Sequence, residues 1–573
     1  MYQYDSPNMI DKTKSGNPFE SKTKHFILML FIVLISFSCS NSESTADAPK
    51  QNNTLPYIKT INGVKQLIVN DEPIIILGGE LLNSSSSSIA YMKPIWPHLK
   101  AMNINTVLMP ISWQQFEKQE GVYDYTLVDS HIKNAHQNDL FVIFLWFGSW
   151  KNGESNYTPD WVKTDMERFP RMRFENGKLS KTISNLSRGC LAVDKKAYLK
   201  FVERIAEVDV NKRVIMLQIE NEVGLLGDSR DYSEEANNEF NGEVPRELIE
   251  YINDNLASLK PIIRSAYEKQ GKKTSGSWEE VFGKSVDTDE MFMAWNYATY
   301  INELSVAGKA IHNIPTFVNA WSATNTNEPG FWPSGGPNYR MLDIWQAAAP
   351  DIDILAIDNY EEAFDAKCRE FVHNQNPLFI PEAVAIWKGD TLSAGAKAFY
   401  TVGHYHAMCF SPFGIDHPVY YNDHPLKLAY SVLSSLMPLM TKAQAEHKIN
   451  AFMEYDTASP SSFILGDYQF TAHYRLKKRP HIKGFGMVIQ TADDEFVIAG
   501  NAFQLVLKSV NSEKPNAQML LLEEGKFVNG KWQTIRVLNG DEFVLKLPAK
   551  PYDLVDNLNL NEISILKARL FSY

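Results

Sequence analysis

The chain has 573 residues, of which 44% are hydrophobic and 22% are charged, with 28 prolines and 30 glycines. These values lie near the globular average and exclude collagen-like, coiled-coil and wholly disordered chains. A formal net charge of −12 argues against nucleic acid as a partner, because nucleic-acid binders carry a basic surface that displaces phosphate counterions. Aromatic residues form 12% of the chain, a surplus that suits both sugar-stacking platforms and a large core.

The N-terminus has the features of an export signal. A short apolar run at residues 26–37 follows two lysines and precedes a serine and Cys39. The run is too short to span a bilayer, for which about 20 residues are needed. A basic flank, a short apolar run and a small residue predict a signal region over residues 1–38, whose first residues would be an over-long start. An ordinary signal peptide and a single anchor helix both fit this pattern.

Cys39 resembles the lipidated cysteine of a bacterial lipoprotein signal. The resemblance implies an exported protein, in the periplasm or at the outer membrane of a Gram-negative-type bacterium, that touches the membrane only through a lipid anchor. Residues 39–58 are polar and cannot bury enough surface to order the chain, so we expect a flexible tether. The other cysteines, Cys190, Cys368 and Cys409, show no CxxC spacing and support neither a disulfide framework nor a zinc site.

The central part of the chain alternates between strand-like and helix-like segments. It begins with a hairpin whose turn lies at Asn70-Asp71. The strand-like runs lie at residues 74–77, 106–111, 140–147, 214–219, 315–320, 352–357, 377–380 and 406–413. The helix candidates lie at residues 91–102, 126–137, 195–209, 246–269, 291–310, 339–348, 362–373 and 394–403. Eight continuous apolar strands separated by helices predict an α/β fold, a (β/α)8 TIM barrel, over residues 59–440.

A doubly wound parallel sheet would give the same alternation of strands and helices. It is disfavoured because the segment GGELLNSSSSS after the first strand lacks the GxGxxG pattern that cradles phosphates. Beyond the barrel, residues 445–573 carry period-2 and apolar strands with turns at 493–494, 529–530 and 539–541. This pattern predicts a smaller β-rich, sandwich-like C-terminal domain.

Carboxylates stand at the ends of two predicted strands. The fourth strand runs into LQIENEVG, where Glu220 and Glu222 are two residues apart and should point the same way on an extended segment, with Asn221 opposed. Glu382 follows the seventh strand. Residues at the carboxyl ends of barrel strands line active sites, although solvated acids at a strand–helix junction look the same in sequence. Two facing carboxyls could protonate a glycosidic oxygen and attack the anomeric carbon or activate water.

The segment QIENEVG resembles the acid/base signature of glycoside hydrolase family 35, the β-galactosidases within clan A, and the chain is also similar to family 42 in places. The segments WPHLKAMNINTV at 96–107 and WQQFEKQEGVYDY at 113–125 resemble further motifs of family 35. The resemblance implies that Glu222 is the acid/base and Glu382 the nucleophile. It further implies that Asn221 donates a hydrogen bond to the sugar 2-hydroxyl.

One segment departs from the family pattern. After the third strand, family 35 usually has a sugar-binding segment like Cys-Ala-Glu-Trp, whereas this chain has WFGSWKNGESNYTPDWV at 146–162. The departure leaves the identity of the sugar open and bears little on the retaining mechanism that the resemblance implies.

Further substrate-binding candidates come from the other strand ends. In the clan that the chain resembles, a Tyr after strand six often hydrogen-bonds the nucleophile, and Trp faces stack on sugars, although barrel packing or loop anchoring explains an aromatic equally well. The candidates are Glu80, Trp113, Glu117, Trp150, Asn319, Trp321, Tyr360 and Trp387, and the strand ends also carry Trp146, Lys151 and Asp358. His404 and His406 lack a matching cluster of acids, so we expect no metal ligands and no cofactor.

Together these features predict a retaining exo-β-glycosidase of β-galactosidase type that acts on terminal β-linked sugars of glycans. One alternative keeps the mechanism and changes the sugar to a glucoside, a xyloside or a side chain of a plant polysaccharide. The other alternative is a non-catalytic glycan-binding lipoprotein of the cell surface. The sequence predicts a carbohydrate ligand in all three cases and gives no oligomeric state.

Overall fold

The computed structural model describes residues 54–573 apart from 325, 385–393, 421–424, 455–459, 475–482 and 550–561. The chain divides into Met1–Gln51 and one compact unit, Asn52–Tyr573, to which all the elements below belong. Among the described residues, no helix combines the length and the apolar character that crossing a membrane requires. The predicted signal region, most of the tether and Cys39 lie outside the described residues.

The predicted N-terminal hairpin is present. Strands β1 (Tyr57–Ile61), β2 (Val64–Val69) and β3 (Glu72–Ile74) form an antiparallel sheet. The turn between β2 and β3 places Asn70 at φ 53° and Asp71 at φ 65°. Asn and Asp are among the residues that adopt this left-handed conformation most readily, which explains why the hairpin was recognisable in the sequence.

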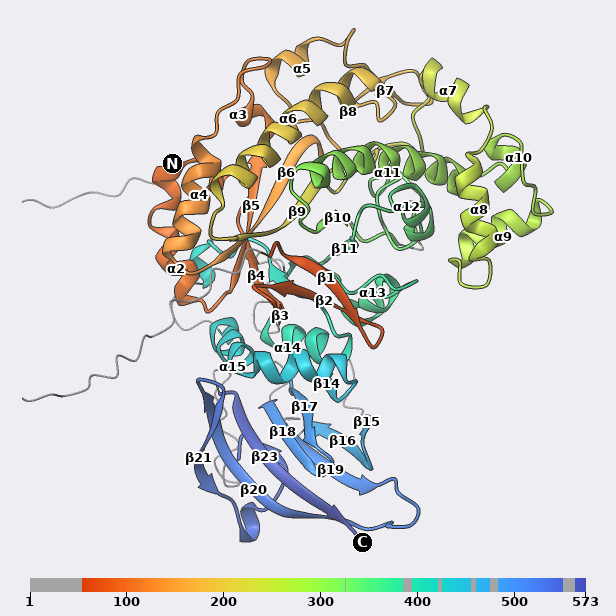
Figure 1. The fold of residues 1–573 in the computed structure, drawn as a ribbon. Coiled ribbons are helices and arrows are strands. Elements are labelled where there is room, and N and C mark those ends of the chain that lie inside the picture. The colour runs from red at the N-terminus through yellow and green to blue at the C-terminus, as the bar shows by residue number, and fades with distance from the viewer. Residues whose placement is uncertain are drawn as a thin grey trace, which may run out of the picture. The chain divides into compact units, whose positions relative to one another are not determined.

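Eight parallel strands close a barrel in chain order, each paired with the next and the last with the first (Figure 1). They are β4 (Ile76–Glu80), β5 (Thr106–Ser112), β6 (Phe141–Lys151), β9 (Val214–Asn221), β10 (Thr316–Ala320), β11 (Ile354–Asn359), β12 (Phe379–Ala383) and β13 (Cys409–Pro412). Every residue of β9, β11 and β12 is buried, as continuous apolar strands require. The predicted barrel is therefore confirmed.

Helices connect the strands and surround the barrel. They are α1 (Ile89–Met92), α2 (Ile95–Ala101), α3 (Trp113–Phe116), α4 (Thr126–Gln137), α5 (Asp160–Thr164), α6 (Arg188–Val208), α7 (Glu234–Phe240), α8 (Arg246–Asp254), α9 (Pro261–Lys269), α10 (Trp278–Phe282), α11 (Val286–Ile311), α12 (Leu342–Ala348), α13 (Phe364–Phe371), α14 (Ala394–His404) and α15 (Pro425–Ala445). A short hairpin, β7 (Arg171–Arg173) and β8 (Leu179–Ile183), lies between α5 and α6.

One expected helix is divided in the structure, and one long helix of the structure was not expected. The single helix expected at 246–269 is divided into α8 and α9, because Pro261 disfavours helical geometry at the preceding Lys260, which has ψ 137°. Helix α15 was not predicted at all. Its sequence carries Pro438 in its interior, a residue that ordinarily ends or kinks a helix.

The C-terminal part consists of two antiparallel sheets around a shared core, which confirms the predicted β-rich domain. One sheet has the order β14 (Ile449–Met453), β17 (Phe485–Ala492), β18 (Glu495–Asn501), β23 (Ser564–Ser572), β20 (Ala517–Val528) and β21 (Lys531–Val537). The other has the order β15 (Ser461–Leu465), β16 (Tyr468–Tyr474), β19 (Phe503–Ser509) and β22 (Lys546–Leu547). Phe496 and Leu566 of the first sheet share a hydrophobic cluster with Phe470 and Leu505 of the second.

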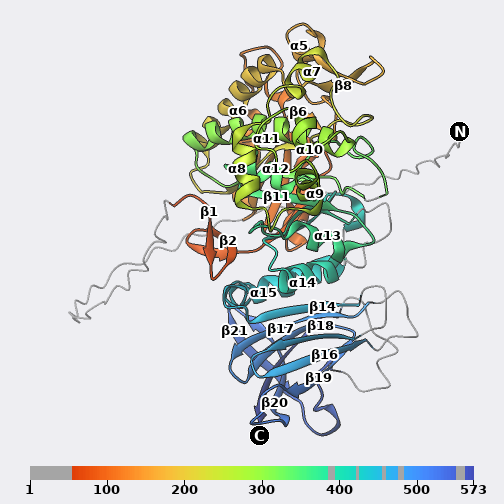
Figure 2. The ribbon, with the colours of Figure 1, turned by 90° about the vertical axis from the view of Figure 1, so that its right-hand side faces the viewer.

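The first C-terminal strands pack on the last helices of the barrel. Figure 2 shows β14 and β17 beside α14 and α15. The rings of Phe399 on α14 and Phe485 on β17 meet edge to face with centroids 5.3 Å apart. Ala451 and Phe485 belong to the same hydrophobic cluster as the barrel, so apolar contact is continuous from the barrel into the larger sheet.

Candidate active site

The carboxyl-terminal ends of the barrel strands bring charged side chains into one buried group. Three of its members end or lie on strands β4, β11 and β12, one ends β6 and one follows β9. These five residues, which we call the carboxylate cluster, are Glu80, Lys151, Glu222, Asp358 and Glu382, and none of them is more than 5% exposed. Four acids and one cation share a site that water barely reaches.

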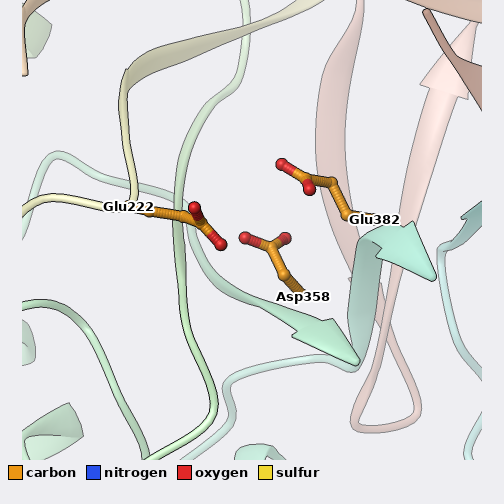
Figure 3. Close-up of side chains that lie close together, drawn as sticks. All are labelled: Glu222, Asp358 and Glu382. Atoms are coloured by element: carbon orange, nitrogen blue, oxygen red, sulfur yellow. The ribbon is translucent and has the colours of Figure 1, made fainter. Parts of the chain in front are cut away.

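Three of the acids point toward one another. One carboxyl oxygen each of Glu222, Asp358 and Glu382 lies within 4.8 Å of those of the other two, and Figure 3 shows the three groups converging from three different elements. Asp358 and Glu382 are register partners on the adjacent parallel strands β11 and β12. Their side chains therefore emerge on the same side of the sheet.

Glu382 is held by three hydrogen-bond donors. Tyr360 donates its hydroxyl to Glu382 Oε2 over 2.8 Å. The side-chain amides of Asn221 and Asn319 both donate to Oε1 over 3.3 Å. The three donors fix the orientation of this carboxyl group, and a fixed orientation suits a nucleophile. The hydrogen bond from Tyr360 is the one that the family resemblance implied.

The groups around Glu222 act on its pKa in opposite directions. Its backbone N–H donates to Asn319 Oδ1 over 3.0 Å, and Asn152 Nδ2 donates to Glu222 Oε2 over 2.6 Å. Burial and the nearby charge of Glu382 raise the pKa of Glu222 to about 7, against the lowering effect of Lys151. A carboxyl group with this pKa is protonated in mildly acidic solution and can serve as a general acid.

Lys151 supplies the positive charge of the cluster. Its ammonium group donates to Asn221 Oδ1 over 2.7 Å and lies 4.8 Å from the centre of the Phe147 ring. Burial lowers the pKa of this lysine, but the surrounding charges of Glu382, Glu222 and other acids outweigh burial and raise it. Lys151 is therefore a fixed cation that orients Asn221.

Glu220 points out of the site, contrary to the expectation that it would lie parallel to Glu222. Its carboxyl accepts hydrogen bonds from the backbone N–H groups of Ser149 at 2.9 Å and Trp150 at 2.7 Å. The cause is the backbone, because Glu220 has φ 61° and Glu222 has φ 45°, so the end of β9 is not extended. Asn221, expected on the opposite side, is instead the residue that faces Glu382.

Glu80 and Asp358 have unsatisfied oxygens. Among the described residues, neither carboxyl oxygen of Glu80 has a hydrogen-bond partner, and neither has Asp358 Oδ1. Burial and the charge of Glu382 raise the pKa values of both groups well above the usual range. Buried acceptors without partners are costly, so each of these two acids needs a further partner, which can be a ligand group or a proton.

The remaining predicted residues take different places. Trp113 and Glu117 bond to each other, Nε1 to Oε2 over 2.7 Å, in the segment after β5. Trp150 is fully buried, donates to the backbone oxygen of Ile183 and packs edge to face on two tyrosines of α11. Trp321 follows β10 and forms a hydrogen bond that lowers the pKa of Glu222. Trp387 lies outside the described residues.

Asn152 is a site residue that the sequence analysis missed. It stands at φ 53°, directly after β6, and reaches Glu222 from 70 positions earlier in the chain. Its neighbour Lys151 was noted only as a residue at a strand end. The one available signal was the polar segment KNG after a long apolar strand, which by itself is typical of any turn.

The three converging acids do not define a metal centre. Their spacing resembles that of carboxylates around a divalent cation, but the ammonium of Lys151 is attracted to the same acids and would repel such an ion. We therefore assign no metal ligands here.

A closed eight-stranded α/β barrel with paired acids at the carboxyl ends of its strands is an architecture that glycoside hydrolases use. Residues 66–262 match the model of glycosyl hydrolases family 35. The chain is thus a family 35-like protein in the part of the barrel that carries Glu222. Residues 426–547 match a domain of unknown function, DUF5597, which begins in α15 and includes strands of both C-terminal sheets but ends before β23. No curated protein matches the chain.

Several solved structures are similar to part of this chain at low sequence identity. The β-galactosidase of Bacillus circulans sp. alkalophilus is 13% identical, with a TM-score of 0.43 over 64% of this chain and 57% of its own. The β-amylase catalytic domain of Paenibacillus polymyxa is 12% identical, with a TM-score of 0.42 over 59% and 92%. The β-galactosidase of Marinomonas ef1 is 11% identical, with a TM-score of 0.41 over 65% and 60%. The chain thus spans little more than half the length of these β-galactosidases.

Proposed function

We propose that the protein is a retaining exo-β-glycosidase of β-galactosidase type. The observation that carries the proposal is the unequal environment of two adjacent carboxyls. Glu382 receives three donated hydrogen bonds, whereas burial and the charge of Glu382 raise the pKa of Glu222. The raised pKa suits Glu222 to the role of acid, and the three donors hold the Glu382 carboxyl in place as the nucleophile.

In the proposed reaction, Glu382 attacks the anomeric carbon and the glycosidic C–O bond breaks. Glu222 gives its proton to the departing oxygen, and the sugar remains bound to Glu382 as an ester. Glu222 then removes a proton from water as the water oxygen attacks the anomeric carbon and releases Glu382. Oxygens of Glu222 and Glu382 within 4.8 Å favour this retaining route, because inversion needs carboxyls about 6.5–9.5 Å apart.

Asn221 has the geometry to bind the sugar beside the reacting carbon. Its amide lies between Lys151, which fixes its oxygen, and Glu382, to which its nitrogen donates. A donor held in this orientation can shift from Glu382 to the sugar 2-hydroxyl when substrate enters. Hydrogen bonds to that hydroxyl strengthen in the transition state.

Two alternatives remain distinct from this proposal. The segment at 146–162 differs from the family pattern, and its Lys151 and Asn152 bond to Asn221 and Glu222 in the site. A glucoside, a xyloside or a polysaccharide side chain could therefore replace the galactoside. A non-catalytic glycan-binding protein is the second alternative. The buried Glu222 and Glu382 favour catalysis over it, because a binding site gains little from two acids that repel each other.

The proposal is tested by turnover of aryl β-galactoside, β-glucoside, β-xyloside and β-mannoside on protein that starts after Cys39. Glu382→Gln is the matched variant. Loss of turnover on one preferred sugar in this variant supports the proposal, and NMR of the first-formed sugar reports retention or inversion. Folded protein that binds glycans without turning over any of these substrates or a panel of polysaccharides would establish the binding alternative.

We also propose that the protein is exported and anchored through a lipid on Cys39. The support is the sequence pattern around residues 26–39. Expression of the full chain and of a Cys39→Ser variant in a Gram-negative host tests this. We expect the parent protein in the membrane fraction and the variant in the soluble periplasmic fraction. Equal membrane retention of both would support the anchor-helix alternative.

A further inference from the structure

The proposed mechanism gives no role to Asp358, one of the acids of the carboxylate cluster. Asp358 is 2% exposed and lies within 4.8 Å of both Glu222 and Glu382 (Figure 3). Its Oδ2 accepts a hydrogen bond from Asn319 Nδ2 over 2.7 Å. Among the described residues, no donor reaches its Oδ1. If Asp358 were ionised, it would face two other acids while its Oδ1 accepted no hydrogen bond.

We propose that Asp358 and Glu222 share a single proton, and that Asp358 is a positioning residue that keeps the acid/base supplied with it. The inference rests on the proposed function and adds a third carboxyl to its two. Two adjacent buried carboxyls repel each other when both are ionised, and one proton between them removes the repulsion and forms a hydrogen bond. Such a proton would also complete the unpartnered oxygen of Asp358.

The surroundings of the pair explain why the proton resides there and not on Glu382. Glu382 already receives three donated hydrogen bonds, whereas Asp358 receives one from a neutral amide. Burial, the charges of Glu382 and Glu222 and a hydrogen bond to Glu222 all raise the pKa of Asp358. The same hydrogen bond lowers the pKa of Glu222, as expected when Asp358 is the donor.

The charged and titratable groups around Asp358 come from every strand end packed against it. They are Glu80 at the end of β4, Lys151 at the end of β6, Glu222 after β9, Tyr360 after β11 and Glu382 on β12. The hydroxyl of Tyr360 is committed to Glu382, and Lys151 bonds to Asn221. Neither of these two groups supplies the proton that the pair needs.

The shared proton keeps the charge of the site constant during the reaction. Before reaction, Glu382 and the Glu222–Asp358 pair each carry one negative charge. The pair's proton passes through Glu222 to the leaving oxygen, and Glu382 becomes a neutral ester as its bond to the anomeric carbon forms. The second negative charge of the pair thus replaces the one lost from Glu382. In the second step the pair regains a proton from the attacking water, and Glu382 is released as a carboxylate.

Infrared spectroscopy of the substrate-free protein tests the shared proton without reference to activity. At about pH 8, where an ordinary carboxyl with a pKa near 4 is ionised, we expect a carboxylic-acid C=O band. Glu80 also has a raised pKa and contributes C=O intensity of its own, so the test is the loss of one C=O component in both Asp358→Asn and Glu222→Gln, because each variant removes one half of the pair. Glu80→Gln is the matched control, since it removes another buried acid of the cluster and should leave this component in place. A spectrum that Asp358→Asn does not change at this pH would overturn the inference.

The pH dependence of kcat/KM gives the second measurement. Asn cannot hold the proton but can still donate to Glu222, so Asp358→Asn should keep kcat/KM within about tenfold of the parent at acidic pH. Its alkaline limb should move to lower pH by about one unit or more, because Glu222 then gives up its proton without an ionised Asp358 carboxylate beside it. An equal loss at every pH would mean that Asp358 only supports the fold. If no substrate is turned over, the proposed function fails while the infrared result still decides the inference.

Discussion

Lys151 and Asn221 are 70 positions apart in the chain, yet the ammonium nitrogen of one lies 2.7 Å from the amide oxygen of the other, inside the barrel. This hydrogen bond fixes which end of the Asn221 amide faces Glu382. It also places a permanent positive charge among four acids. Lys151 therefore supplies the positive charge of the site and also sets the orientation of Asn221.

Replacing Lys151 by methionine tests both of these roles. Because the charge of Lys151 lowers the pKa of Glu222, Lys151→Met should raise that pKa and move the alkaline limb of kcat/KM to higher pH. We also expect kcat/KM at its optimum to fall by about 10²-fold, since Asn221 loses its fixed orientation. Lys178→Met, at an exposed position, is the control and should match the parent. An unmoved limb would show that Lys151 does not act on Glu222.

Glu80→Gln should make the protein more stable and weaken its binding of substrate. Burial and the charge of Glu382 raise the pKa of Glu80 well above its usual range, so at neutral pH the folded state must hold a proton that the unfolded state gives up, and Gln removes this cost. The melting temperature at neutral pH should therefore rise. KM should increase about tenfold or more if the carboxyl binds sugar hydroxyls, because the amide has one acceptor fewer. A lower melting temperature would indicate that Glu80 supports the fold.

The pH dependence of stability follows from Glu222. Its pKa is raised from 4.5 to about 7 in the folded protein, so between these values the folded state binds more protons than the unfolded state. The free energy of unfolding must then fall as pH rises through this range. Glu222→Gln removes this contribution, which should make it more stable than the parent at about pH 8, by ~1–3 kcal/mol. Thermal unfolding at several pH values measures the difference, and parallel curves for both proteins would contradict it.

Gly148→Ala tests the close contact behind the site. A Cβ atom at this position of β6 would lie 2.5 Å from Glu220 Oε1 and 2.4 Å from Trp146 Nε1. Because Glu220 is fixed by two backbone N–H groups, it cannot move aside. We expect a loss of ~1–3 kcal/mol in the free energy of unfolding and a fall in kcat/KM, since β6 carries Lys151. A denaturant titration gives the first quantity, and an unchanged midpoint would mean that the strand end has room to adapt.

The barrel was predictable because its strands are continuous apolar runs with helices between them, a pattern that depends only on local sequence. Glu222 and Glu382 stood out because acids at strand ends are unusual after such runs. The direction of Glu220 was not predictable, because the left-handed backbone at Glu220 and Glu222 reverses the alternation that an extended strand imposes. Such conformations are maintained by tertiary contacts and often occur at functional sites.

The contacts that Lys151, Asn152 and Asp358 make could also not be predicted from the sequence. Each residue acts on a partner that another strand supplies, and strand register is set by packing of the whole barrel. The break before Pro261 could have been found, since proline restricts the residue that precedes it. Helix α15 was missed because an interior proline obscured its pattern.

The continuous apolar contact between α14, α15 and the first C-terminal strands bears on how the protein can be divided. Ile449, Ala451 and Met487 of the larger sheet belong to the barrel's own hydrophobic cluster. A fragment that ends at Ala445 would leave the barrel side of this contact open to water, and large exposed apolar patches promote aggregation. The barrel and the sheets should therefore unfold in one cooperative transition, and a soluble catalytic fragment should require the chain through its last strand.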